Sequence, residues 1–142
     1  ALMDAAHAQF GQVFHINCHS MNAVSGSMGE GGAGQPRADV VLGDRFGAAA
    51  GREVVERIEQ AFRDAGLRVV RNAPFAGAYI AQAYGRPSRG AHVVQVEIDR
   101  SLYMDEARIE RRADFPAFRA VMAGVIDRIT AGFAGGAALA AE

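Results

Sequence analysis

The spacing of apolar residues along the chain predicts two long helices. Residues 48–65 have the clearest helical period, with Arg and Glu side chains on the opposite face. A second helix is predicted to begin near Asp114, a suitable N-cap, with Pro116 in its first turn. A helical pattern over residues 1–10 stops at Gly11, as expected of a C-cap. The apolar stripes of the two long helices are Val54, Val55, Ile58, Ala61, Phe62 and Ala65, and Phe115, Phe118, Met122, Val125 and Ile129.

Four shorter apolar runs predict β-strands, at residues 12–18, 38–43, 67–71 and 92–98. Strands that alternate with helices favour a layered α/β fold whose sheet is at least partly parallel. Residues 22–36 are rich in Gly and Ser and are expected to form a long loop. In the last strand the side chains alternate between two faces, with Val93, Gln95 and Glu97 on one and Val94, Val96 and Ile98 on the other.

Composition describes a single globular domain over residues 1–142. Half of the residues are hydrophobic, 22% are charged and the net charge is −1, which excludes a strong electrostatic footprint for nucleic acid or an anionic membrane. No apolar run approaches the ~20 residues that span a bilayer, and no signal peptide is visible. We therefore expect a cytoplasmic protein. The single cysteine, Cys18, excludes an internal disulfide and is expected to be a buried, inert thiol.

Polar side chains follow or end each predicted strand. Ligands of open α/β sheets gather at the carboxyl ends of parallel strands, so these side chains are expected to form a site. The four residues concerned are His19, Asp44, Asn72 and Glu97.

Two of these residues suit metal-assisted hydrolysis. His19 can offer a ring nitrogen to Zn²⁺, or it can be an ordinary polar residue at a strand end. His15 shares its face but lies about 13 Å away along a strand, too far to hold the same ion. Glu97 interrupts an apolar run, which suits a desolvated general base or an ion pair with Arg100 or another arginine.

All 15 basic residues are arginines. A GC-rich genome explains this bias, and so does a site for carboxylates, which the guanidinium fork binds with two hydrogen bonds. Arginines flank several predicted strand ends, and the segment NAPFAGAY adds an amide and a phenol that can reach a cleft. The resulting substrate-binding candidates are Arg37, Arg45, Asn72, Tyr79 and Arg100.

Four ordered motifs carry a family resemblance, from about His15 to about Glu106. They are HINCHSM, RADVVLGDRFG, RNAPFAGAYI and GRPSRGAHVVQVEIDRSLYMDE. In these motifs the chain resembles N-formylglutamate amidohydrolases. The resemblance implies a zinc-peptidase-like, three-layer α/β/α fold with a mixed, mostly parallel sheet. It also implies hydrolysis of N-formyl-L-glutamate to formate and L-glutamate, a reaction of histidine degradation.

The resemblance also implies roles for individual residues. His19 matches the last of three zinc ligands, and Glu97 matches the glutamate that activates the zinc-bound water and passes its proton to the leaving amine. Arg37, Asn72 and Arg100 are candidates for holding the substrate carboxylates or stabilising the oxyanion.

The chain departs from the family in two ways. The two earlier zinc ligands have no counterpart, so the chain, which starts without Met in a helical pattern, reads as the C-terminal part of the domain. The missing ligands are expected in an absent N-terminal segment. Asp99 replaces the usual Asn, and its charge would raise the pKa of Glu97 if both carboxylates faced the cleft.

Two interpretations of function remain open from the sequence. One is the zinc amidohydrolase acting on a small N-acyl amino acid, with the activity of the isolated chain in question. The other is a non-catalytic module that binds a dicarboxylate or amino acid without a complete metal site. In either case an incomplete domain exposes a sheet edge, which can lead to self-association.

Overall fold

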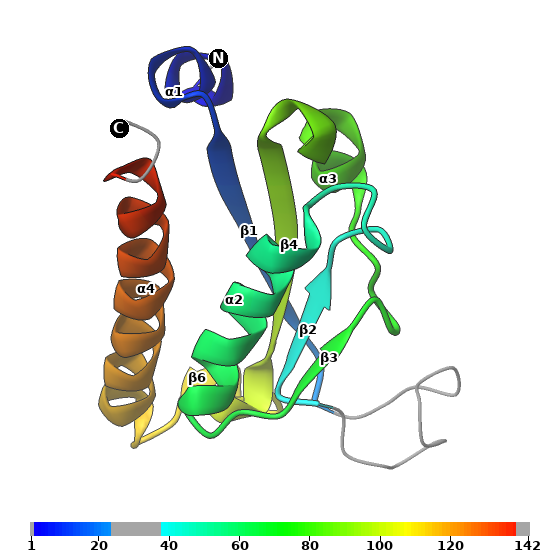
Figure 1. Ribbon diagram of the computed structural model, residues 1–142. Coiled ribbons are helices and arrows are strands. Elements are labelled where there is room, and N and C mark those ends of the chain that lie inside the picture. The colour runs from blue at the N-terminus through cyan, green and yellow to red at the C-terminus, as the bar shows by residue number, and fades with distance from the viewer. Residues whose placement is uncertain (1, 24–37, 139–142) are drawn as a thin grey trace.

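The computed structural model describes residues 2–23 and 38–138, except for the side chains of residues 132 and 134–138. It contains four helices and a four-stranded sheet within these ranges (Figure 1). The helices are α1 (Leu2–Phe10), α2 (Arg52–Asp64), α3 (Tyr79–Tyr84) and α4 (Phe115–Ala138), and the sheet strands are β1 (Val13–Met21), β2 (Val40–Gly43), β3 (Val69–Arg71) and β4 (Ala91–Asp99).

The sheet is mixed and mostly parallel, as predicted. Its order is β1-β4-β2-β3, with β1 parallel to β4 and β2 parallel to β3. The central pair, β4 and β2, is antiparallel. The carboxyl ends of β1 and β4 therefore lie at one end of the sheet, and those of β2 and β3 lie at the other. The expectation that all four strand ends meet at one site is wrong for this reason.

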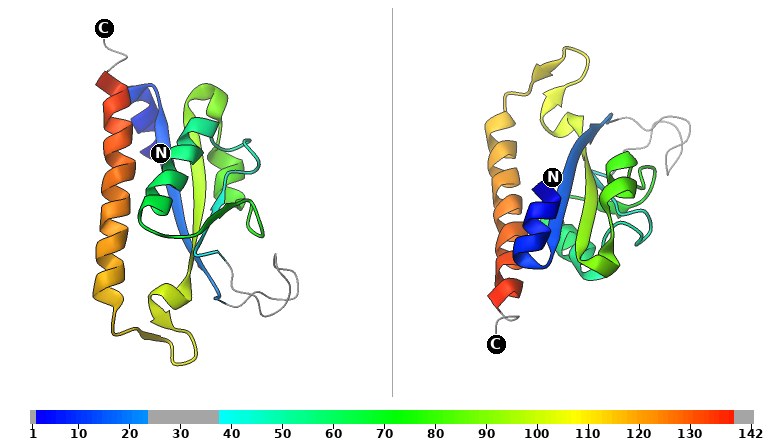
Figure 2. Two further views of the ribbon diagram at one scale, coloured as in Figure 1. Left: turned by 60° about the horizontal axis from the view of Figure 1, so that its bottom comes forward. Right: turned by 90° about the horizontal axis from the view of Figure 1, so that it is seen from above.

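Helices cover both faces of the sheet, which gives three layers. The main core lies between the sheet and the pair α2 and α4, where Val94 and Val96 of β4 meet Ile58 of α2 and Val125 of α4. On the other face, Val93 packs against Ala81 of α3, with Met3 of α1 beside them. Figure 2 shows α3 and α4 on opposite sides of β1 and β4. We call these the α4 face and the α3 face.

Alternation along the strands sorts their side chains between the two faces. In β1, Phe14 stacks on Phe133 of α4, with the ring centroids 3.9 Å apart. The neighbouring positions, His15, Asn17 and His19, consequently belong to the α3 face. In β4 the same rule places Gln95 and Glu97 on the α3 face. At this end of β4 the α3 face is therefore polar, whereas the α4 face carries the apolar side chains of Val94 and Val96.

Several element bounds differ from the expected ones. β1 continues to Met21, three residues past its predicted end, so His19 lies inside the strand. After β4 the chain forms a short 3-10 helix and a small hairpin of β5 (Met104–Asp105) and β6 (Glu110–Arg111), which the apolar pattern did not predict. In the described part of the chain no helix is both long and apolar enough to cross a membrane.

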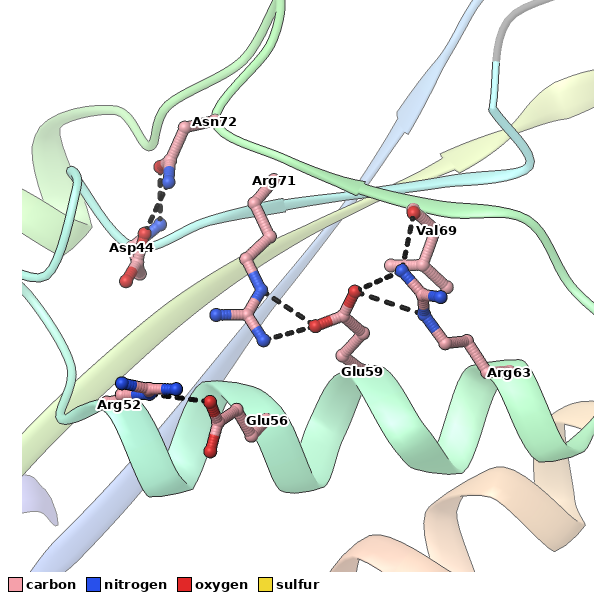
Figure 3. A network of polar contacts seen from close by, with 8 residues as sticks. All are labelled: Asp44, Arg52, Glu56, Glu59, Arg63, Val69, Arg71 and Asn72. Atoms are coloured by element: carbon pink, nitrogen blue, oxygen red, sulfur yellow. Dashed lines mark hydrogen bonds and ion pairs between the residues drawn. The ribbon is translucent and has the colours of Figure 1, made fainter.

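An ion-pair network fastens the edge strand β3 to α2 (Figure 3). Glu59 accepts hydrogen bonds from Arg71 Nε at 2.8 Å and from Arg63 Nη2 at 2.6 Å. Burial alone would raise the pKa of Glu59, but the hydrogen bonds from the two arginines outweigh it and the pKa lies below its usual value. Arg71, one of the arginines at a strand end, therefore has a structural partner.

Candidate active site

His19 and Glu97 face each other on neighbouring parallel strands. They are direct partners in the β1–β4 register, and His19 Nδ1 lies 3.6 Å from Glu97 Oε1. The His19 side chain is 42% exposed and that of Glu97 is 8% exposed. In such a pair the accessible imidazole can bind a metal ion, and the largely buried carboxylate can transfer a proton to or from a bound group.

Glu97 is held by a residue that sequence reasoning placed on the same face but gave no role. Gln95 Nε2 donates to Glu97 Oε1 at 2.8 Å, and Gln95 Oε1 accepts from the backbone N–H of Ala78 at 2.8 Å. The signal in the sequence was a second polar residue within an apolar strand. Opposite Gln95, the side-chain nitrogen of Asn17 is buried and has no hydrogen-bond partner among the described residues.

Arg100 lies at the same end of the sheet as this pair, directly after β4. Its guanidinium contacts Asn22 Oδ1, and its Nε is 3.5 Å from Glu106 Oε1. Glu106 in turn accepts from the backbone N–H of Ala23 at 3.1 Å. These contacts tie together the segments that follow β1 and β4. Among the described residues Arg100 pairs with Glu106, so the expected ion pair between Glu97 and Arg100 is not formed there.

Asn72 and Asp44 lie elsewhere, at the carboxyl ends of β3 and β2. Asn72 Oδ1 accepts from the Asp44 backbone N–H at 3.1 Å, and Asn72 Nδ2 donates to Asp44 Oδ1 at 2.6 Å (Figure 3). Asn72 has a φ of 60°, a left-handed conformation that Asn tolerates better than most residues. Both side chains thus stabilise the loops that follow β2 and β3, at the opposite end of the sheet from Arg100.

The other substrate-binding candidates have mixed positions. Arg45 follows β2 with a φ of 55°, and its backbone N–H donates to Ala76 O at 2.7 Å. Tyr79 begins α3 and is 73% exposed. Arg37 lies outside the described residues.

Two further expectations meet the structure here. Cys18 is exposed on β1 rather than buried, although partial burial still raises the pKa of its thiol. Asp99 is buried on the same strand face as Glu97, and one of its carboxylate oxygens accepts from Ser101 N and Ser101 Oγ, both at 2.8 Å. Because Asp99 serves the turn after β4, its charge is directed at Ser101.

A cavity of about 500 Å³ lies at the other ends of β1 and β4. It is lined by Phe14, His92 and Phe133 among others, on the α4 face. His92 Nδ1 accepts from the Gly51 backbone N–H at 3.0 Å, and burial lowers the pKa of His92. His92 thus has a partner at the start of α2 and is not part of the His19–Glu97 site.

The described residues do not complete a catalytic metal site. Such a zinc site has three protein ligands and an open position. His19 offers one nitrogen and Glu97 one carboxylate, and no group of three or more His, Cys, Asp and Glu side chains gathers within the described ranges. The donor set of this part of the chain therefore falls short of what zinc requires.

Comparisons with known proteins agree on one family. The family model for N-formylglutamate amidohydrolase matches residues 1–104. An N-formylglutamate deformylase of Pseudomonas aeruginosa is 32% identical over 127 residues, which is 87% of this chain and 46% of that protein. Another, from Pseudomonas putida, is 30% identical over 105 residues, which is 73% of this chain and 38% of that protein.

A solved structure gives the same result. The crystal structure of N-formylglutamate amidohydrolase from Ralstonia eutropha JMP134 matches with a TM-score of 0.76 and 31% identity, over 93% of this chain and 48% of that one. The chain thus spans less than half the length of these relatives. With the family model matching well over half of its residues, the chain belongs to the N-formylglutamate amidohydrolase family.

Proposed function

We propose that this chain carries the Glu97 and His19 portion of a zinc-dependent amidohydrolase site that cleaves N-formyl-L-glutamate to formate and L-glutamate. The observation that carries the proposal is the register of β1 and β4, which sets His19 Nδ1 3.6 Å from the carboxylate of Glu97. Membership of the family supports the reaction and the substrate, and the zinc-peptidase-like ancestry of the fold is part of the same proposal.

Glu97 is the general base and acid in this scheme. Its carboxylate takes a proton from the water that attacks the formyl carbon, and later delivers that proton to the amine nitrogen of the departing glutamate. Burial suits this role, because it keeps bulk water away from the carboxylate and leaves room for the attacking water alone. The exposed imidazole of His19 marks the open side of the site from which substrate enters.

Zinc, when bound, would polarise the formyl carbonyl as a Lewis acid. Within the described residues, His19 is the nitrogen ligand that we assign to it. Since these residues provide too few donors, the remaining ligands must come from outside them, and we derive no step from the metal.

Arg100 is the residue that we propose for a substrate carboxylate, because it lies at the same end of the sheet as Glu97. Its present partners are Asn22 and Glu106, so substrate binding would exchange one of these contacts for a carboxylate. Asn72 and Arg45 follow the carboxyl ends of β3 and β2, at the end of the sheet away from Glu97. We assign them to holding the loops there and not to binding substrate.

The test is formate release by the purified chain in the presence of zinc. The proposal predicts release from N-formyl-L-glutamate and far slower release from N-formylglycine, which lacks the side-chain carboxylate. A Glu97→Gln variant should release formate at least about 10²-fold more slowly than the wild type. Equal rates on the two substrates would remove the assignment of Arg100. No release from either would contradict catalysis by this chain.

A second function is favoured by the shortage of metal ligands. A chain that holds N-formylglutamate or glutamate without turnover would be a binding module. Calorimetric titration with both compounds, in the presence of a chelator, separates the two. Binding that survives chelation without formate release supports the module, and an Arg100→Ala variant should then lose it.

A further inference from the structure

Gln95 is a buried polar side chain whose amide oxygen and amide nitrogen both form hydrogen bonds. It is 3% exposed, accepts from Ala78 N through Oε1 and donates to Glu97 through Nε2. A backbone N–H can only donate, so the oxygen of Gln95 must face Ala78. The NH₂ group is then directed at Glu97, and this fixes the orientation of the amide.

We propose that Gln95 is a positioning residue for Glu97, a role that rests on the proposed function for its catalytic meaning. Its hydrogen bond to Oε1, the oxygen that also lies 3.6 Å from His19 Nδ1, fixes the orientation of the carboxylate. In this arrangement the second oxygen, Oε2, exchanges the proton with the attacking water. The placement of Glu97 consequently depends on the segment 72–78, which supplies the Ala78 N–H.

The segment 72–78 is a firm support because it lies directly on β2. Its first residue, Asn72, donates through its backbone N–H to Leu42 O at 2.8 Å, and Ala76 O accepts from Arg45 N. Directly after Ala76, Gly77 approaches Gly43 so closely that a Cβ on Gly43 would lie 2.5 Å from Gly77 N. The support for Glu97 is therefore backbone, which moves less than a side chain.

Packing alone does not account for a glutamine at this position. A buried amide costs free energy unless both of its ends find partners, and an apolar side chain of similar size would fill the space without that cost. Ala78 N could not by itself satisfy the NH₂ group, because it is a donor. Glu97 is the acceptor that does so, which ties the choice of glutamine to the carboxylate.

The experiment compares Gln95→Met with Gln60→Met. Methionine keeps the volume of Gln95 and removes both hydrogen bonds. Gln60 is the matched control, since its amide donates to the Asp64 carboxylate at 2.7 Å on the exposed side of α2, away from the site. Both variants are assayed for formate release, for hydrogen exchange of the Ala78 amide and for the NMR signals of the His19 ring.

The proposal expects a specific pattern. Gln95→Met should lower kcat for N-formyl-L-glutamate by about 10- to 100-fold, the range for losing a residue that orients a catalytic group, with little change in KM. The Ala78 amide should exchange up to about tenfold faster. The His19 signals should shift toward those of Glu97→Gln. Gln60→Met should change none of these.

Two outcomes would overturn it. If Gln95→Met speeds Ala78 exchange but leaves kcat at the wild-type value, Gln95 is a structural residue only. If the wild-type chain releases no formate, the proposed function fails for this chain. The NMR signals of His19 then decide whether Gln95 positions Glu97. In that case unchanged His19 signals in Gln95→Met would show that Gln95 does not position Glu97.

Discussion

Glu97 and His19 meet across the parallel pair of β4 and β1, with the carboxylate buried and the imidazole exposed. The two side chains come from distant parts of the sequence and depend on a single strand register. A shift of one residue would turn one of them to the opposite face. The approach of His19 to Glu97 therefore requires the exact register in which β1 and β4 pair.

Glu97→Gln is predicted to abolish proton transfer without unfolding the chain. The amide keeps the shape of the carboxylate and can still accept from Gln95, but it cannot take a proton from water. We expect kcat for formate release to fall by about 10²- to 10⁴-fold, the usual contribution of a general base. Glu56→Gln on the exposed side of α2 is the control. Wild-type turnover by Glu97→Gln would remove Glu97 from the mechanism.

His19→Ala is predicted to weaken zinc binding by at least about tenfold, because the loss of even a supporting residue around a metal has that effect. His15→Ala is the control on the same strand face, about 13 Å away. The measurement is zinc affinity by competition with a chromophoric chelator, alongside zinc content per chain. If both variants bind as the wild type does, zinc is held by residues other than His19.

Glu59→Gln is predicted to destabilise the chain by about 1–3 kcal/mol, because Arg71 and Arg63 lose a charged acceptor. Glu56→Gln, which breaks an exposed pair with Arg52, should cost less than about 1 kcal/mol. Denaturant unfolding at neutral pH measures both. Equal effects would show that the network in Figure 3 adds nothing beyond a surface pair.

The same network predicts a dependence on pH. The folded chain lowers the pKa of Glu59 from its ordinary value of 4.5, so the unfolded chain binds the proton more readily. The stabilisation is complete above pH 4.5 and is lost as the pH falls through the lower, folded pKa. Between pH 6 and pH 3 the free energy of unfolding should therefore fall less steeply for Glu59→Gln than for the wild type. Denaturant unfolding at several pH values in this range measures it.

Gly43→Ala is predicted to destabilise the chain by about 1–3 kcal/mol through overpacking. The new Cβ would lie 2.5 Å from Gly77 N and 2.7 Å from Ala76 C, which are backbone atoms that cannot turn aside. Gly124→Ala in α4 is the control, since nothing lies within 4 Å of its Cβ position and alanine favours a helix by up to about 1 kcal/mol. Opposite signs of the two changes in unfolding free energy are the expected result.

Local patterns predicted the elements well and their relative directions poorly. The stripe around Ile58, the cap at Gly11 and the alternation around Glu97 each depend on near neighbours, and the structure confirms the corresponding helices and strand. The antiparallel pairing of β4 with β2 depends on contacts between residues far apart in the sequence, and the local spacing of apolar residues does not predict such contacts. Asn72 was therefore expected beside Glu97 and lies at the other end of the sheet.

Side-chain partners were the hardest feature to predict. The Gln95 amide bridges a strand and a loop that only the folded sheet brings together. Arg71 lies at a strand end, as several other arginines do, yet its position over α2 gives it Glu59 as a partner. Residue type and spacing alone could not distinguish these cases.

The order of the sheet also has a consequence for how the chain folds. β2, α2 and β3 follow one another in sequence and pair locally, so this unit can form early. β1 must find β4 across most of the chain, and the closure of so large a loop is slow. A refolding chain is thus expected to regain most of its secondary structure before His19 reaches Glu97, and any activity should recover after the circular dichroism signal.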